Sequence, residues 1–120
     1  MSQSVFVGID LGASRTKVAI LNSEKTLIGR SVKNSGTDYV KTAEACLTEA
    51  LEMAGAGTKE IAATVATGYG RKNVSFADDT KTEIACHAKG CFDSFPKAIS
   101  IIDIGGQDCK IIRVDRFCIF

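Results

Sequence analysis

Two aspartate–glycine segments, each lying between two apolar runs rich in β-branched residues, constrain the fold of this chain most. The first covers residues 8–12 and the second residues 103–108, with Asp10 and Asp103 at equivalent places. A strand, a glycine turn and a second strand form a unit whose backbone N–H groups can surround a phosphate while the carboxylate holds a metal ion. Two copies of one supersecondary unit predict two similar domains that close on one ligand.

Alternating apolar positions at the start of the chain predict an antiparallel meander, because turn residues separate runs that have a period of two. The predicted strands of this meander cover residues 5–10, 16–21 and 27–33. Residues 38–54 carry an apolar stripe at helical spacing, and a further short apolar run follows at residues 61–67. A strand that follows a helix typically joins a sheet in parallel. We therefore expect an α/β fold with a mixed sheet, made of the meander, added parallel strands and flanking helices.

A second helix is predicted to begin with a capping box, in which Thr80 is the N-cap and Glu83 reaches back to it. Pro96, the only proline, ends that helix and marks a boundary. Further strands then repeat the opening of the chain, at residues 99–103, 110–114 and 117–120. We therefore expect one domain over residues 1–95 and the start of a second, equivalent domain over residues 96–120.

The composition is that of an ordinary globular domain. The chain has 120 residues, 45% of them hydrophobic and 24% charged, and a formal net charge of +1. It contains no run of basic residues, so neither nucleic acid nor an anionic membrane surface is an expected partner. No apolar stretch is long enough to cross a bilayer and no signal peptide is evident, so we expect a cytoplasmic protein.

The cysteine pattern does not indicate a disulfide framework. The five cysteines, an odd number without Cys-x-x-Cys spacing, are Cys46, Cys86, Cys91, Cys109 and Cys118. Without a secretion signal, reduced and mostly buried thiols are expected. The spacing also disfavours a metal or cluster site made from these residues alone.

The first aspartate–glycine segment supplies several groups that suit a phosphate ligand. Gly12 lets a phosphate approach the backbone, and Ser14 and Thr16 add hydroxyls to the backbone N–H donors. Lys17 can place a cation near the phosphates. Asp10 ends an apolar strand, where a carboxylate is costly unless a cation or a water network uses it. The alternative is a plain β-hairpin with a solvated aspartate, because short glycine motifs also match by chance.

The second segment offers equivalent groups. Gly105 and Gly106 remove side chains where the backbone must come close, and Asp103 stands as the first aspartate does. Gln107 and Asp108 can orient water or a metal ion. A glycine-rich hairpin is again the alternative. The repetition in equivalent positions favours phosphate binding at both turns.

Two other features leave their interpretation open. Residues 67–71 place flexible glycines at a strand end, a position that commonly lines a ligand site, but a plain loop with a solvated Arg71 fits equally well. His87 lies one helical turn from both Glu83 and Cys91. Two candidate ligands do not make a zinc or cluster site, so a structural hydrogen bond between Glu83 and His87 is favoured.

The order of these motifs resembles one family over nearly all of the chain. After Gly-Ile-Asp-Leu-Gly and Thr-Lys, the motifs are Ala-Thr-Gly-Tyr-Gly-Arg at 66–71, Thr-Glu-Ile-Ala-Cys-His-Ala-Lys-Gly at 82–90 and Ile-Asp-Ile-Gly-Gly-Gln-Asp-Cys-Lys at 102–110. This order resembles the ATPase activators of 2-hydroxyacyl-CoA dehydratases and the related ATPase subunits of benzoyl-CoA reductase. The resemblance implies a ribonuclease H-like (actin-like ATPase) fold, shared with Hsp70 and sugar kinases.

The resemblance also implies an activity and its cofactors. Family members are oxygen-sensitive homodimers with one [4Fe–4S] cluster at the subunit interface. MgATP binding and hydrolysis change the dimer's shape and drive a low-potential electron into the partner enzyme. By residue matching, Asp10 and Asp103 are the catalytic residues and lie near Mg²⁺ and its waters. The residues that match the nucleotide-binding positions are Gly12, Ser14, Thr16, Lys17, Gly105, Gly106 and Gln107.

The chain also departs from the family pattern. The family's cluster cysteines lie downstream of the Gly-Gly-Gln-Asp motif in segments that this sequence lacks, and the neighbours of Cys118 do not match them. The segment that would hold adenine is missing as well. We therefore expect an N-terminal half, with negligible hydrolysis and no electron transfer on its own. Its unpaired strands after Pro96 are expected to drive self-association.

Two other functions remain open from the sequence. A small-molecule kinase of the same fold would transfer phosphate to a metabolite, but no acid outside the two turns is a convincing catalytic base. The other is a non-catalytic fragment or interaction module, which the absence of half of the nucleotide site favours.

Overall fold

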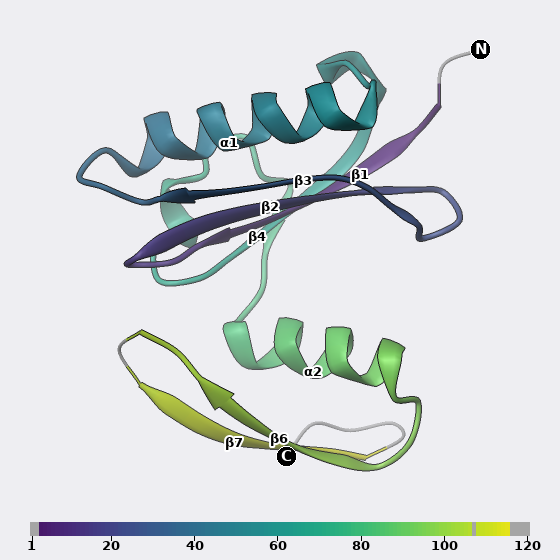
Figure 1. The fold of residues 1–120 in the computed structure, drawn as a ribbon, viewed down its shortest axis with the longest axis vertical. Coiled ribbons are helices and arrows are strands. Elements are labelled where there is room, and N and C mark those ends of the chain that lie inside the picture. Colours follow the sequence, from purple (N-terminus) through teal and green to yellow (C-terminus); the bar gives the residue numbers. More distant parts are fainter. Residues whose placement is uncertain (1–2, 107, 116–120) are drawn as a thin grey trace. The chain divides into compact units, whose positions relative to one another are not determined.

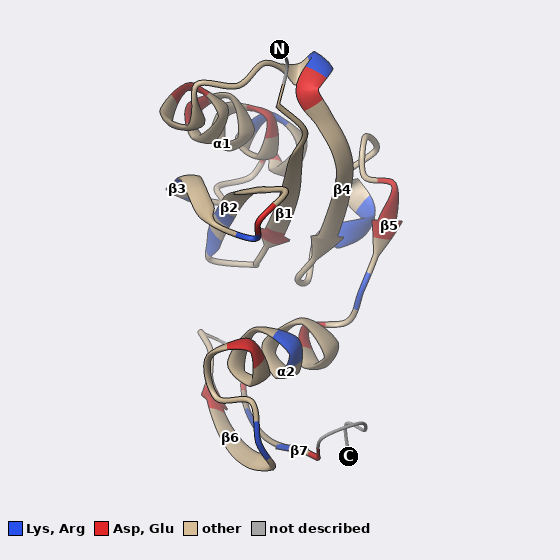
Figure 2. Ribbon diagram, turned by 90° about the vertical axis from the view of Figure 1, so that its right-hand side faces the viewer, with Lys and Arg blue, Asp and Glu red and all other residues tan. Residues whose placement is uncertain are grey.

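The computed structural model describes residues 3–106 and 108–115 and divides into two compact units, Met1–Thr80 and Lys81–Phe120 (Figure 1). The first unit contains a five-stranded sheet with helix α1, and the second contains a two-stranded sheet with helix α2. In the described part of the chain, no helix is long and apolar enough to cross a membrane. Basic and acidic residues are interspersed over the elements of both units (Figure 2).

The sheet of the first unit has the strand order β3-β2-β1-β4-β5. The first strands form an antiparallel meander, whereas β4 pairs in parallel with β1 and β5 in parallel with β4. The predicted meander and the parallel addition are therefore confirmed, and β1 is paired on both edges. The strands are β1 (Val5–Leu11), β2 (Arg15–Asn22), β3 (Leu27–Asn34), β4 (Ile61–Thr67) and β5 (Asp79–Thr80).

Alternation along β1 decides which face of the sheet is buried. Val5, Val7, Ile9 and Leu11 are buried, and the residues between them lie on the opposite face. Helix α1 (Tyr39–Ala54) covers the buried face (Figure 1). Each fully buried aliphatic side chain contributes about 1.5–3 kcal/mol to folding. The buried residues of α1 are Ala43, Cys46, Leu47, Ala50 and Leu51.

The ends of α1 follow from local chemistry. The carboxylate of Asp38 accepts a hydrogen bond from the N–H of Lys41 at 3.1 Å, which caps the first turn. Gly55 adopts φ +67° after the last helical residue, a conformation that glycine reaches without strain. The helix predicted at residues 38–54 is confirmed, with Asp38 as its cap.

The second unit is a helix packed on a hairpin. Helix α2 (Glu83–Ser94) packs on β6 (Ile99–Ile104) and β7 (Cys109–Val114), which pair in antiparallel (Figure 1). The small core consists of Ala88, Ile112 and Val114, with Phe92, Ile99 and Ile101 packed around it. By packing, the units divide between Thr80 and Lys81. The boundary between residues 95 and 96, which concerns the repeated domains, stays a prediction.

The start of α2 differs from the prediction, because the choice of Thr80 as N-cap is wrong. The N-cap is Thr82, whose hydroxyl accepts a hydrogen bond from the N–H of Ala85 at 3.2 Å. Thr80 instead belongs to the short strand β5, where pairing with Ala66 keeps its backbone extended. The predicted strand at residues 117–120 lies outside the described residues.

We predict that Gly29→Ala destabilises the first unit, because Gly29 of β3 lies directly against α1. A Cβ at this position would collide with the carbonyl oxygen of Ala50 and lie 2.9 Å from the Cβ of Ala54. Overpacking of this kind lowers the free energy of unfolding by about 1–3 kcal/mol, measurable by urea denaturation. The control is Gly8→Ala, where a Cβ meets no atom within 4 Å. Equal stabilities of the two variants would contradict this packing.

Candidate functional site

The turn between β1 and β2 is too tight for a side chain at position 12. The N–H of Gly12 donates to the carbonyl oxygen of Arg15 at 3.0 Å, and a Cβ on Gly12 would lie only 2.7 Å from that oxygen. The turn sets Asp10 and Lys17 opposite each other, with 3.4 Å between Lys17 Nζ and Asp10 Oδ2. A carboxylate and an ammonium therefore stand together at the end of the central strand.

The turn between β6 and β7 repeats this geometry. The N–H of Gly105 donates to the carbonyl oxygen of Asp108 at 2.8 Å, which closes a turn with the same spacing as the first. Asp103 lies opposite Lys110 across the strand pair, as the acid and the lysine do in the first turn. The two sequence segments thus form equivalent turns, each described within its own unit.

Lys110 contacts acidic side chains of both the second turn and α2. Its Nζ donates to Asp108 Oδ1 at 3.1 Å and lies 3.9 Å from Glu83 Oε2 on α2. The hydrogen bond to Asp108 raises the pKa of Lys110 above its ordinary value; desolvation opposes this, and the negative charges of Asp108, Glu83 and Asp103 add to it. The lysine therefore stays positively charged at neutral pH.

His87 makes a hydrogen bond that the sequence analysis missed. Its Nδ1 lies 2.7 Å from Oδ2 of Asp103 on β6, in a part-buried position. We expected Glu83 to be its partner. Asp103 is 16 residues further along the chain, so the spacing of residues within the helix does not indicate this contact. The second aspartate thus has an imidazole beside it.

Ser35, between β3 and α1, braces the first turn from its buried side. Its hydroxyl donates to the carbonyl oxygen of Gly12 at 2.6 Å, and its N–H donates to the carbonyl oxygen of Ser14 at 3.0 Å. Because this uses the only O–H of Ser35, the hydroxyl of Thr16 donates to Ser35 Oγ over 2.9 Å. Nothing in the local sequence around Ser35 indicates this role, since the contacts are long-range.

The structure brings some of the predicted ligand residues together and turns one away. Ser14 and Lys17 are exposed beside Gly12 at the first turn, next to Asp10. The side chain of Thr16 is fully buried on the core side, so its hydroxyl faces Ser35. In the second unit, Gly105 and Gly106 are exposed at the tip of the hairpin. Gln107 lies outside the described residues.

The turn after β4 packs directly against the end of β1. Gly68 has φ +94°, and a Cβ there would lie 2.6 Å from Asp10 Oδ1. The N–H of Gly70 donates to the carbonyl oxygen of Leu11 at 2.8 Å. The guanidinium of Arg71 donates to the carbonyl oxygen of Gly68 at 3.0 Å, so Arg71 holds the turn. The sequence left open whether residues 67–71 line a ligand site or form a plain loop with a solvated Arg71. These contacts place the segment next to the Asp10 carboxylate, which favours the first interpretation.

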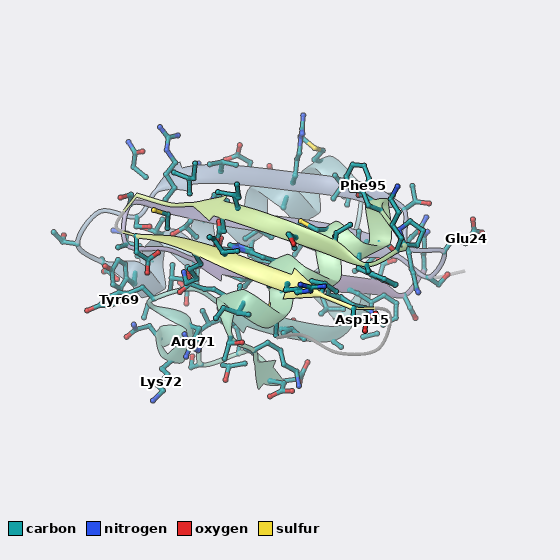
Figure 3. All side chains as sticks on the ribbon, turned by 90° about the horizontal axis from the view of Figure 1, so that it is seen from below. Glu24, Tyr69, Arg71, Lys72, Phe95 and Asp115 are labelled. Carbon is teal, nitrogen blue, oxygen red and sulfur yellow. The ribbon has the colours of Figure 1, made fainter. Side chains whose placement is uncertain are left out.

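The side chains around this turn divide into a structural one and two that face outward. Figure 3 shows Tyr69, Arg71 and Lys72 at the short helix η2 (Arg71–Asn73), with Tyr69 and Lys72 pointing away from the fold. Both are exposed, whereas Arg71 is only partly exposed because it bonds to the turn. The groups of this segment that remain accessible are thus a phenol and an ammonium.

The thiols do not gather in the described part of the chain. Cys46, Cys86, Cys91 and Cys109 are free, and among the described residues no three side chains of His, Cys, Asp or Glu are grouped as a metal site. Cys118 lies outside them. These residues therefore do not fit an iron–sulfur cluster. The Asp10 carboxylate beside the first turn does fit Mg²⁺ bound with nucleotide phosphates, because that ion needs only one or two carboxylates and keeps several waters.

Comparison with known sequences decides the family. Residues 7–117 match the BadF/BadG/BcrA/BcrD ATPase family. The chain belongs to this family. The activator of lactoyl-CoA dehydratase from Anaerotignum propionicum is 46% identical over 109 residues, covering 91% of this chain and 42% of the relative. The (R)-2-hydroxyglutaryl-CoA dehydratase activating ATPase from Acidaminococcus fermentans is 38% identical over 111 residues, covering 92% and 42%. The chain spans about two fifths of the length of these curated relatives.

Solved structures of this family share the fold. Component A of (R)-2-hydroxyglutaryl-CoA dehydratase from Acidaminococcus fermentans superposes with a TM-score of 0.87 at 36% identity, over 93% of this chain and 43% of that one. The activator of 2-hydroxyisocaproyl-CoA dehydratase from Clostridium difficile, with bound ADPNP, superposes with a TM-score of 0.84 at 31% identity, over 98% and 44%. The predicted actin-like ATPase fold is therefore confirmed.

We predict that Ser35→Ala destabilises the first turn, because it removes the donor to Gly12 and leaves a carbonyl oxygen and the Thr16 hydroxyl without their partner. The expected loss in free energy of unfolding is about 1–3 kcal/mol. Amide hydrogen exchange at Gly12 should accelerate as well. Ser14→Ala is the control, since the Ser14 side chain is exposed. Unchanged exchange at Gly12 in Ser35→Ala would show that the turn does not depend on this brace.

Proposed function

We propose that the protein is an ATP-dependent activator that couples ATP hydrolysis to electron transfer into a 2-hydroxyacyl-CoA dehydratase. The observation that carries the proposal is the repeated turn, in which an aspartate faces a lysine beside a glycine N–H. Nucleotide binding is supported by the family, whose members are ATPases, and by the relative solved with ADPNP. Charged groups at a glycine turn suit a phosphate ligand.

In the first unit, we assign the phosphate contacts to the accessible side of the turn. The N–H groups after Gly12 and the hydroxyl of Ser14 donate to phosphate oxygens, and Lys17 supplies a positive charge. Asp10 would hold Mg²⁺ and would orient the water that attacks the terminal phosphate. Thr16, proposed from the sequence as a ligand, contributes through the turn that its hydroxyl supports. When bound, Mg²⁺ neutralises the charge that develops on the phosphates.

In the second unit, we assign the equivalent role to Asp103 and the phosphate contacts to the turn that contains Gly105 and Gly106. The hydrogen bond from His87 to Oδ2 restrains the Asp103 carboxylate, and we assign its other oxygen to a water or metal ion. Catalysis of phosphate transfer rests mainly on positioning and charge, which such fixed groups supply. We propose that binding of the nucleotide phosphates at such a turn acts as the switch.

The proposed partner is a dehydratase, because the relatives are named as activators of lactoyl-CoA, (R)-2-hydroxyglutaryl-CoA and 2-hydroxyisocaproyl-CoA dehydratases. A benzoyl-CoA reductase is the second candidate, through the resemblance of the motifs. The [4Fe–4S] cluster of the family stays a proposal for the whole protein. We also propose a cytoplasmic location, where ATP is available.

Self-association is proposed through the second unit. Ile102, Ile104 and Ile111 are 73%, 78% and 80% exposed, and they lie on the hairpin face turned away from α2. An exposed apolar strand face of this kind favours pairing with another copy.

We predict that Ile111→Thr weakens this association by about tenfold or more, since it removes the most exposed apolar side chain of this face. Sedimentation over a range of concentrations measures the effect. Val32→Thr, an exposed apolar position in the first unit, is the control. A monomer at all concentrations would contradict the self-association.

We predict that Asp10→Asn weakens binding of MgADP and MgATP by about tenfold or more, because the charge that holds the metal is lost. Calorimetric titration of the full-length protein measures both affinities. Glu44→Gln, an exposed position on α1, removes the same charge elsewhere in the unit. Saturable binding that Asp10→Asn weakens about tenfold or more, and that Glu44→Gln leaves unchanged, supports the proposal. Absence of saturable binding by the unsubstituted protein would refute it.

A further inference from the structure

Thr67 stands in a row of polar side chains that crosses three strands. In the parallel pairing of β1 with β4, Thr67 lies beside Asp10, and in the antiparallel pairing of β1 with β2, Lys17 lies on the other side of Asp10. Side chains in register on neighbouring strands project from the same face of a sheet. The three groups therefore share one face, at the carboxyl ends of β1 and β4.

The hydroxyl of Thr67 has no hydrogen-bond partner among the residues that the structure describes. The residue is 8% exposed, and its Oγ1 is buried. Burying a hydroxyl without a partner disfavours folding, and valine, which has the same shape, would avoid that penalty. The hydroxyl of Thr67 is therefore available to form a hydrogen bond with a water molecule or a ligand.

The neighbouring carboxylate is also incompletely used. The separation of 3.4 Å between Lys17 Nζ and Asp10 Oδ2 is longer than the 2.7–2.9 Å typical of a strong charge-assisted hydrogen bond. Gly68, next to Thr67, leaves no Cβ between its backbone and Asp10 Oδ1. A hydroxyl that can donate and accept thus lies beside a carboxylate with free acceptor sites.

We propose that the Thr67 hydroxyl binds a water molecule of a hydrated Mg²⁺ that Asp10 holds together with the nucleotide. This inference rests on the proposed nucleotide-binding function and adds a residue to that site. Mg²⁺ keeps several of its waters when it binds phosphates, and those waters need acceptors and donors from the protein. Thr67 is a positioning residue in this arrangement, since it acts through water.

The test uses the full-length protein. It compares calorimetric titrations with ADP in excess Mg²⁺ and in EDTA. Thr67→Val should weaken binding of MgADP about tenfold and leave binding of metal-free ADP unchanged. Thr67→Ser, which keeps the hydroxyl, should bind MgADP within about twofold of the unsubstituted protein. Thr67→Ala provides a second hydroxyl deletion in case the valine variant folds poorly.

The matched control is Ser31→Ala. Ser31 is another buried residue of the sheet with a hydroxyl group, and its register beside Val18 places it on the α1 face, on the side of Glu49. Its removal should leave the affinity for MgADP unchanged. Equal affinity of Thr67→Val and the unsubstituted protein for MgADP would overturn the inference, and so would an equal loss with and without Mg²⁺. Absence of ADP binding by the unsubstituted protein would instead refute the proposed function.

Thermal melting gives a readout that does not involve activity. Without nucleotide, Thr67→Val should melt at or above the temperature of the unsubstituted protein, because an unpaired buried hydroxyl is gone. The rise in melting temperature produced by saturating MgADP should be smaller in Thr67→Val than in Ser31→Ala. Equal rises in the two variants would show that Thr67 has no role in ligand binding.

Discussion

Burial of alternate side chains of β1 beneath α1 is the constraint on which the rest of the structure depends. The apolar residues of this strand face the helix, so Asp10 must face the other side of the sheet at the strand's end. A register slip of one residue would exchange the two sets and put the carboxylate under the helix. Because β2 and β4 both pair with β1, the same constraint fixes which residues flank Asp10 on either side.

Each unit contains a turn of the same kind, but the aspartates beside the two turns have different neighbours. Asp10 lies beside a lysine, a glycine turn and a buried threonine, whereas Asp103 is bonded to His87 from a helix. The second unit also buries a much smaller core, centred on Ala88 and two residues of β7. Repetition of a backbone motif therefore does not make its two carboxylates chemically equivalent. Their surroundings differ in charge and in hydrogen-bonding groups.

Local periodicity was sufficient to predict most of the fold. The meander, α1 and β4 follow from the spacing of apolar residues, and the strand pairing follows from the order of these elements. The N-cap of α2 was misassigned because two threonines, Thr80 and Thr82, both suit a cap by chemistry, and only strand pairing decides between them. The sequence analysis also left β5 out, because its residues are polar and exposed.

The candidate site was predicted less completely, for physical reasons. The inward direction of Thr16 follows from alternation with Val18 and Ile20, whose burial the strand pattern already indicated. Ser35 and His87 act through partners distant in the sequence, and no local pattern reports such contacts. The unpaired hydroxyl of Thr67 is visible only once every polar atom around it has been placed.

The hydrogen bonds of Ser35 have a mechanical consequence. The hydroxyl of Ser35 donates to Gly12 in the turn between β1 and β2. The carbonyl oxygen of Ser35 accepts a hydrogen bond at 2.9 Å from the hydroxyl of Thr42, near the start of helix α1. Hydrogen bonds through Ser35 thus connect the turn to the start of the helix. A helix of 16 residues is about 24 Å long, so a tilt of about 5° at its start carries its far end about 2 Å. A small displacement of the turn between β1 and β2 that tilts α1 would therefore produce a larger displacement at the far end of the helix.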